Sequence, residues 1–313
     1  MTYTKSLRSK PKNKTFKMNC HPNNKNKIHK NTCYSEDALL KIRDAYNTTH
    51  TNKIKTKNPK KIYNVLRKRL DHCEKEDCWM DIIKDQEVKY ELDRLLFAPD
   101  SPADWKKNPT TWLSNYDIRD VLKQYEVAYP KFKLLGPSSI DYDTILDDGK
   151  CVWQDLCRLS LKDLQRRHKS KLGVVFNLDE HYEPGSHWVS LFVDNDEKLI
   201  LYYDSAVNPV PNEVKRLIRE IQEQGKSLDN PIEYEVIKNK YSHQTTNTEC
   251  GMYSLFFIIT MTSGKLNKRI RNQMNGGGKG MSYRLSRDQK IMLFTEPGLN
   301  DAMMKKFRKE YFN

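Results

Sequence analysis

The sequence predicts an α+β fold, in which a central mixed, mostly antiparallel sheet is flanked by helices and preceded by a helical N-terminal domain. Two neighbouring stretches, 185–194 and 198–205, have the alternating or apolar character of strands and are joined by a short turn, as in an antiparallel pair. Apolar residues recur at helical spacing through much of 35–96. A polar loop that begins at Ser242 becomes a continuous apolar run at Met252, which is typical of a buried helix.

Composition and proline positions divide the 313 residues into three parts. Residues 1–31 form a basic arm, residues 32–98 a small helical domain and residues 99–313 a larger α+β domain. Pro99 and Pro102 mark the second boundary.

The arm carries nine lysines and arginines and no acidic residue, and we expect it to be disordered. The functional interpretation is contact with nucleic-acid phosphates; the alternative is a solvated tail or a localisation signal. The net charge of +14 favours a polyanionic partner, although charge also serves solubility. The candidate phosphate contacts are Lys5, Arg8, Lys10, Lys12, Lys14 and Lys17.

Three helices are predicted in the N-terminal domain. Leu39, Ile42 and Tyr46 share one face of the first. The second spans about 61–70 and the third about 79–96.

Between the last two helices lies the stretch DHCEKEDC. His72, Cys73 and Cys78 suggest zinc, but a second ligand pair at matching spacing is missing. Structural cysteines are therefore favoured, and no metal is expected.

The same patterns predict the other elements of the larger domain. A helix begins at Ser114 or Asn115, and the glycine-rich stretch 275–281 is a flexible surface loop. Further helices are expected at 153–167, 214–221 and 299–313, and further strands at 172–178 and 232–237.

Cys250 lies where the polar loop becomes the buried helix. The unpaired N–H groups of a helix start favour thiolate over thiol and can stabilise a developing oxyanion. The alternative interpretation is a buried structural cysteine.

A nucleophilic cysteine needs an imidazole as base and a carboxylate to orient that imidazole. His187 opens one predicted strand and Asp204 closes the next, so neighbouring antiparallel strands can deliver them side by side. Gln244 precedes Cys250 by six residues and can add an amide donor to an oxyanion hole. The rival base is His181, which lies in a loop with no following strand to hold it.

The cysteines number seven, and they are scattered. We expect no disulfide framework, which suggests a reducing compartment. The sequence shows neither a secretory signal peptide nor an apolar run of membrane-spanning length.

The order His187–Trp188, Asp204–Ser205, Gln244 and Cys250–Gly251 resembles the adenain and SUMO-protease (Ulp1-like) clan of cysteine proteases. Within that clan, the length and the helical N-terminal extension resemble the polyprotein-processing core proteases of large cytoplasmic DNA viruses, such as the African swine fever virus protease. The resemblance implies His187 as base, Asp204 as its orienter, Gln244 as oxyanion donor and Cys250 as nucleophile.

The resemblance also implies substrate contacts. Trp188 is expected to line a narrow channel, and Trp112 and Leu113 are similar to the clan's Trp-Leu motif beside the substrate. The acidic residue of that motif is replaced by Asn115 or displaced to Asp117.

The function implied is that of a cysteine endopeptidase cleaving after Gly-Gly-type sites in viral core or capsid polyproteins during particle assembly. Its partners would be glycine-containing protein substrates and non-specific DNA, without a membrane or a cofactor. Its location would be the virion and the host cytoplasm. The alternatives are a protease that removes ubiquitin-like modifiers from host proteins and a nucleic-acid-binding structural protein of the particle core.

Overall fold

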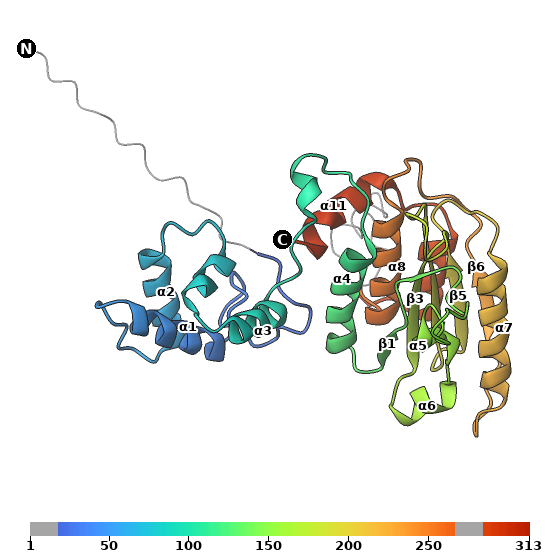
Figure 1. Ribbon diagram of the computed structural model, residues 1–313, viewed down its shortest axis with the longest axis horizontal. Coiled ribbons are helices and arrows are strands. Elements are labelled where there is room, and N and C mark those ends of the chain that lie inside the picture. Colours follow the sequence, from blue (N-terminus) through green and yellow to red (C-terminus); the bar gives the residue numbers. More distant parts are fainter. Residues whose placement is uncertain (1–17, 267–283) are drawn as a thin grey trace, which may run out of the picture. The chain divides into compact units, whose positions relative to one another are not determined.

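A computed structural model describes residues 18–266 and 284–313 (Figure 1). The chain divides into two compact units, one of Met1–Ala98 with Asn313 and one of Pro99–Phe312.

The N-terminal unit is helical, as expected. Leu39, Ile42 and Tyr46 are buried on one face of its first helix, which confirms the helical spacing. Ser35 caps that helix and Asn58 caps the second, each by accepting a backbone N–H with its side chain. The helices are α1 (Glu36–Thr49), α2 (Pro59–Arg69), the 3₁₀ helix η1 (Glu76–Ile82) and α3 (Gln86–Leu96).

The predicted single helix over 79–96 is wrong, because the chain breaks between η1 and α3. The side chain of Asp85 accepts the backbone N–H groups of Glu87 and Val88 and so starts a new helix.

The predicted disordered arm is wrong for its second part, residues 18–31. Met18 and His21 are buried, and the N–H of His21 donates to the carbonyl of Leu96 at 2.9 Å. These contacts hold residues 18–31 on the helices despite their basic composition. The candidate phosphate contacts, from Lys5 to Lys17, lie outside the described residues.

The expectation of unpaired cysteines is also wrong. Three disulfides join Cys20–Cys33, Cys73–Cys78 and Cys151–Cys157, and Cys250 is free. The partners are only 13, 5 and 6 residues apart, so local turns bring them together without a long-range framework. The inference of a reducing compartment loses its support.

The larger unit is built on a mixed sheet that is antiparallel in its centre, which confirms the fold class. Its strand order is β1-β3-β4-β5-β6, with the short β2 pairing to β3. Strands β3, β4 and β5 pair antiparallel, and β1, β2 and β6 are added in parallel. The strands are β1 (Phe132–Leu134), β2 (Ser138–Ser139), β3 (Lys171–Asn177), β4 (Trp188–Asp194), β5 (Leu199–Tyr203) and β6 (Glu235–Lys238).

Helices cover both faces of this sheet, α8 and α4 on one side and α7 on the other (Figure 1). Alternate residues of β4 divide between the two cores: Phe192 packs towards α8, whereas Val189 and Leu191 pack towards α7. The helices are η2 (Ala103–Lys106), α4 (Asn115–Ala128), α5 (Gln154–Cys157), α6 (Leu161–Arg166), α7 (Asn212–Lys226), α8 (Cys250–Ser263), α10 (Arg287–Thr295) and α11 (Asp301–Tyr311).

Two other expectations differ from the structure. The helix predicted over 153–167 is two short helices, because Ser160 caps α6 with its side chain. The glycine-rich stretch 275–281 lies outside the described residues. Among the residues that are described, none of the helices has both the length and the apolarity to cross a membrane.

Candidate active site

Three elements deliver the candidate side chains to one end of the sheet. His187 directly precedes β4, Asp204 directly follows β5, and Cys250 is the first residue of α8. Because β4 and β5 are antiparallel, with Ser190 opposite Tyr203, the start of one strand lies beside the end of the other. The sequence pattern thus brings the three residues together as expected.

His187 and Asp204 form a close pair. Nε2 of His187 lies 2.6 Å from Oδ1 of Asp204. Oδ1 also accepts the N–H of Ala206 at 2.9 Å, and Oδ2 accepts the N–H of Asn208 at 2.7 Å. Asp204 is buried, so these donors replace the water that it has lost.

These contacts shift both ionisation equilibria. Burial alone would raise the pKa of Asp204, but the hydrogen bond and charge of His187 and the two amides outweigh it and lower that pKa. Burial alone would lower the pKa of His187, yet hydrogen bonds and charges from Asp204 and Cys250 raise it to about 9. The pairing therefore favours the protonated imidazole.

Cys250 is buried at the start of α8, where the helix has no side-chain cap. Its thiol lies close enough to His187 to raise the pKa of that imidazole. Since Asp204 engages Nε2 of the imidazole, Nδ1 is the nitrogen left for a proton exchange with the thiol. A proton carrier thus lies between a sulfur nucleophile and a carboxylate.

Gln244 is held close to this group through Ser205, the residue after Asp204. The hydroxyl of Ser205 donates to Oε1 of Gln244 at 2.6 Å. The carbonyl of Ser205 accepts the N–H groups of His243 and Gln244 at 2.9 and 3.0 Å. The Gln244 amide donates one N–H to the carbonyl of Thr246 and keeps a second for another acceptor.

Two side chains of α11 fix the loop that precedes Cys250. Asp301 accepts the N–H groups of Thr245 and Thr246. Arg308 pairs with the buried Glu249 at 3.0 Å and also donates to the carbonyls of Thr248 and Thr111. The carbonyl of Thr111 belongs to the segment that carries Trp112.

Two of the three candidate substrate-contact residues, Trp188 and Leu113, lie at the first turn of α8. The indole N–H of Trp188 donates to the carbonyl of Leu113 at 3.1 Å, and both residues are buried. A Cβ on Gly251 would lie 3.1 Å from Leu113 and 3.4 Å from Trp188, so glycine permits this close approach. Trp112 is 39% exposed. Asp117 serves α4 in a capping box with Ser114.

The rival histidines have other partners. Nδ1 of His181 lies 2.6 Å from Oδ2 of Asp141, so it forms a second His–Asp pair, separate from the one at Cys250. His243 lies in the loop before Cys250 but is buried, and it contacts the hydroxyl of Tyr203 and the carbonyl of Glu296.

Sequence reasoning assigned no role to Ser205, Glu249, Asp301 and Arg308. A signal existed for the last of these, because Arg308 directly follows Phe307 in the buried stripe of α11. A cation in such a stripe is paired when buried.

A buried thiol at a helix start, beside an imidazole that a carboxylate orients, on a sheet flanked by helices, defines a cysteine-type peptidase. Residues 162–278 match the Ulp1 protease family, C-terminal catalytic domain. The chain is 30% identical over 258 residues to a putative thiol protease of Acanthamoeba polyphaga mimivirus, covering 75% of this chain and 82% of that protein. The chain belongs to this Ulp1-type family of cysteine proteases.

Viral relatives extend the comparison. The chain is 31% identical over 160 residues to a cysteine protease of African swine fever virus, covering 49% of this chain and 58% of that protein. The crystal structure of an African swine fever virus protease superposes with a TM-score of 0.62 at 20% identity, covering 94% of this chain and 95% of that one. This likeness is one of fold.

Proposed function

We propose that this peptidase is an endopeptidase that cleaves after Gly-Gly-type sites and matures core or capsid polyproteins during assembly of a viral particle. The observation that carries the catalytic part is the hydrogen-bonded series Cys250, His187 and Asp204.

The chemistry runs through an acyl-enzyme. The sulfur of Cys250 attacks the peptide carbonyl, and the imidazolium of His187 gives its proton to the leaving amine. His187 then takes a proton from water, which hydrolyses the thioester. Asp204 orients the imidazole throughout. The N–H of Cys250 and the side-chain amide of Gln244 stabilise the oxyanion.

The test of this assignment is peptide cleavage by single variants. Cys250→Ala and His187→Ala should each abolish cleavage and leave the circular dichroism spectrum unchanged, whereas Asp204→Asn should be less severe. His181→Ala is the matched control, because it removes an imidazole from the other His–Asp pair. Full activity in Cys250→Ala, or loss of activity only in His181→Ala, contradicts the assignment.

The Gly-Gly preference rests on the packing of Trp188 and Leu113 against Gly251. A substrate strand that reaches Cys250 past this indole has little space for a β-carbon. Gly-Gly peptides should therefore be cleaved faster than Ala-Ala peptides.

The variant Trp188→Phe tests that preference better than alanine would. It keeps most of the volume of a buried side chain but removes the hydrogen bond to Leu113, whereas an alanine would create a cavity costing about 3–5 kcal/mol. In Trp188→Phe, the ratio of the Gly-Gly cleavage rate to the Ala-Ala cleavage rate should be lower than in the unmodified chain. Equal cleavage of both peptides by the unmodified chain rules out the preference.

A second candidate function is removal of ubiquitin-like modifiers from host proteins. One relative, 29% identical over 160 residues, is named a SUMO-1 cysteine protease of African swine fever virus. The two functions share their catalytic residues and differ in substrate. Parallel assays on a modifier conjugate and on a viral polyprotein distinguish them, because only the true substrate class is cleaved at low enzyme concentration.

The basic arm is proposed to bind DNA without sequence preference and to retain the enzyme in the assembling particle within the host cytoplasm and later in the virion. This rests on the net charge of +14 and the acid-free stretch 1–31. Binding to duplex DNA should weaken with salt by a log–log slope of about −0.9 per phosphate contacted, and deleting residues 1–17 should flatten that slope. If the deletion leaves the salt slope unchanged, the arm does not bind the DNA. DNA binding without hydrolysis would instead support a structural protein of the core.

A further inference from the structure

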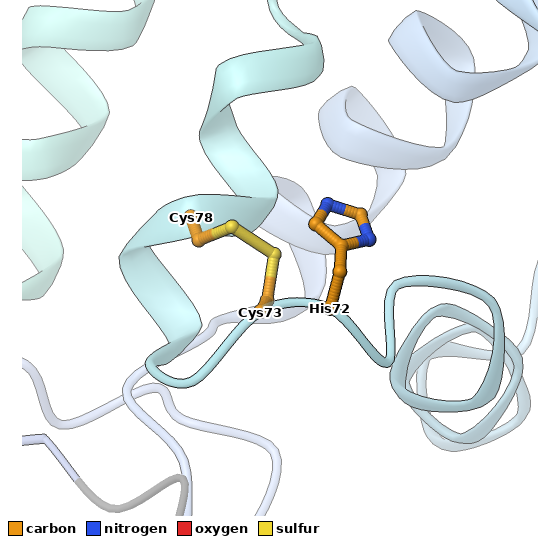
Figure 2. A group of neighbouring side chains, drawn as sticks. All are labelled: His72, Cys73 and Cys78. Atoms are coloured by element: carbon orange, nitrogen blue, oxygen red, sulfur yellow. A yellow bond between two sulfur atoms is a disulfide. The ribbon is translucent and has the colours of Figure 1, made fainter.

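A second cluster of reactive side chains lies far from Cys250 in the sequence, in the N-terminal unit. The ligand atoms of His72, Cys73 and Cys78 all lie within 4.8 Å of one another, and the two sulfurs are joined as a disulfide. Figure 2 shows the His72 imidazole and the Cys73 sulfur rising from the same loop on the same side, with Cys78 reaching them from η1. Local sequence therefore supplies three donors to one place.

Besides the bond between the sulfurs, hydrogen bonds of the backbone hold the two cysteines in place. The N–H of Cys73 donates to the carbonyl of Leu70 at the end of α2, at 3.1 Å. The N–H of Cys78 donates to Oδ1 of Asp77 at 2.9 Å. Cys73 is 1% exposed, whereas His72 is exposed. The site is thus anchored on one side and open to solvent on the other.

Two thiolates and an imidazole are the donor set of Zn²⁺ sites, and an exposed fourth position can be filled by water. The stretch that carries the ligands is acidic, although the last turn of α2 before it is basic. Residues 71–78 contain Asp71, Glu74, Glu76 and Asp77 against Lys75, in a chain whose net charge is +14. Glu76 is turned inward to the N–H of Cys33 and the hydroxyl of Tyr63.

We propose that His72, Cys73 and Cys78 form a redox-gated Zn²⁺ site, in which the disulfide and the zinc complex are alternative states. A thiol reductant passes two electrons and two protons to the disulfide and becomes a disulfide itself. The thiols of Cys73 and Cys78 then release their two protons as their sulfurs, with one nitrogen of His72, bind the ion.

Another disulfide of the chain, Cys151–Cys157, provides a control for the metal site. In the part of the chain that the structure describes, His72–Cys73–Cys78 is the one group of three such ligands that lies close enough for a metal. Cys151–Cys157 has nearly the same sequence separation, 6 residues against 5, but no such third ligand among the described residues. It is the matched control pair.

The experiment titrates Co²⁺, a spectroscopic substitute for zinc, into the reduced full chain carrying Cys250→Ala, which removes the other thiol beside an imidazole. The expected result is about one equivalent bound with thiolate-to-cobalt charge-transfer absorption, displaced by Zn²⁺. Cys73→Ser should abolish this absorption, and His72→Ala should weaken binding by about tenfold or more. Cys151→Ser with Cys157→Ser should leave it unchanged.

Melting provides an independent readout. Zn²⁺ should raise the melting temperature of the reduced chain and not of the oxidised chain. If Cys73→Ser fails to fold, the exposed His72→Ala variant still tests the site. The proposal is overturned if the reduced chain shows no charge-transfer band, or if His72→Ala binds Co²⁺ as tightly as the unsubstituted site. It is also overturned if the band is lost only in the Cys151/Cys157 variant.

Discussion

At the scale of single residues, Ser205 joins two parts of the active site. It follows Asp204 directly, and its hydroxyl and carbonyl both bond to Gln244. Because Ser205 holds the side-chain oxygen of Gln244, it also fixes the direction of the side-chain N–H groups. Ser205 is therefore a positioning residue for Gln244, the oxyanion donor. A serine after an aspartate is too common for sequence alone to assign it this role.

Ser205→Ala should lower kcat by about tenfold with little change in KM, since the oxyanion forms only in the transition state. Gln244→Ala should lower kcat by about 10²–10³-fold. In the double variant the two losses should not add, because Ser205 acts through Gln244. Additive losses in this steady-state comparison argue against positioning, and Ser205→Thr, which keeps the hydroxyl, should restore most of the rate.

The His187–Asp204 pair also makes stability depend on pH. The pKa of His187 is raised from 6.5 to about 9 on folding, so its contribution is complete below pH 6.5 and is lost as pH rises through about 9. The pKa of Asp204 is lowered from 3.8, so its contribution is present above pH 3.8 and is lost in more acidic solution. The melting-temperature difference between the unmodified chain and His187→Gln should shrink from pH 6.5 to 9. A constant difference across that range contradicts the raised pKa.

At the scale of elements, the sequence predicted helices correctly except where a capping residue starts a new helix within an apolar pattern. Periodicity located α1, α4 and α7, whose buried stripes are long, and the cysteine at the start of α8. Periodicity did not detect the chain breaks before α3 and before α6. At these breaks Asp85 and Ser160 cap new helices. A polar cap within an apolar pattern is weak evidence from sequence, because the same residues also occur inside helices.

Helix α11 is the element whose role is most open to test. Arg308→Ala should destabilise the chain by about 3–5 kcal/mol, because it leaves the buried carboxylate of Glu249 unpaired, and should reduce cleavage by loosening the loop before Cys250. Denaturant unfolding and peptide cleavage measure the two effects. The matched control is Lys306→Ala on the same helix, at an exposed position. Equal stability of Arg308→Ala and Lys306→Ala excludes the clamp, that is, the fixing of the loop before Cys250 by Arg308.

At the scale of the whole molecule, the disulfides are distributed unequally between the two units. Cys20–Cys33 and Cys73–Cys78 lie in the N-terminal unit, and Cys151–Cys157 lies in the larger one. Sequence reading could not find these pairs, because connectivity depends on turns that bring short-range partners together. It placed residues 18–31 in the disordered arm because of their basic, acid-free composition.

Reduction in the presence of a metal chelator should therefore destabilise the N-terminal unit more than the other. Loops of this size stabilise by about 2–3 kcal/mol each in the chain-entropy account. Calorimetry of the full chain should show the transition of the N-terminal unit moving to lower temperature by more than that of the larger unit. Alanine in place of Cys20 and Cys33 should reproduce part of this shift, and equal shifts of both transitions would contradict it.

The clamp made by Arg308 has a consequence for protein synthesis. Glu249 and Arg308 are 59 residues apart in the chain, with the nucleophile on the earlier side. A ribosome therefore synthesises Cys250 before it synthesises the side chain that fixes the loop before it. During translation the nucleophile cannot gain this contact until α11 has been made, so completion of the active-site loop is tied to synthesis of α11.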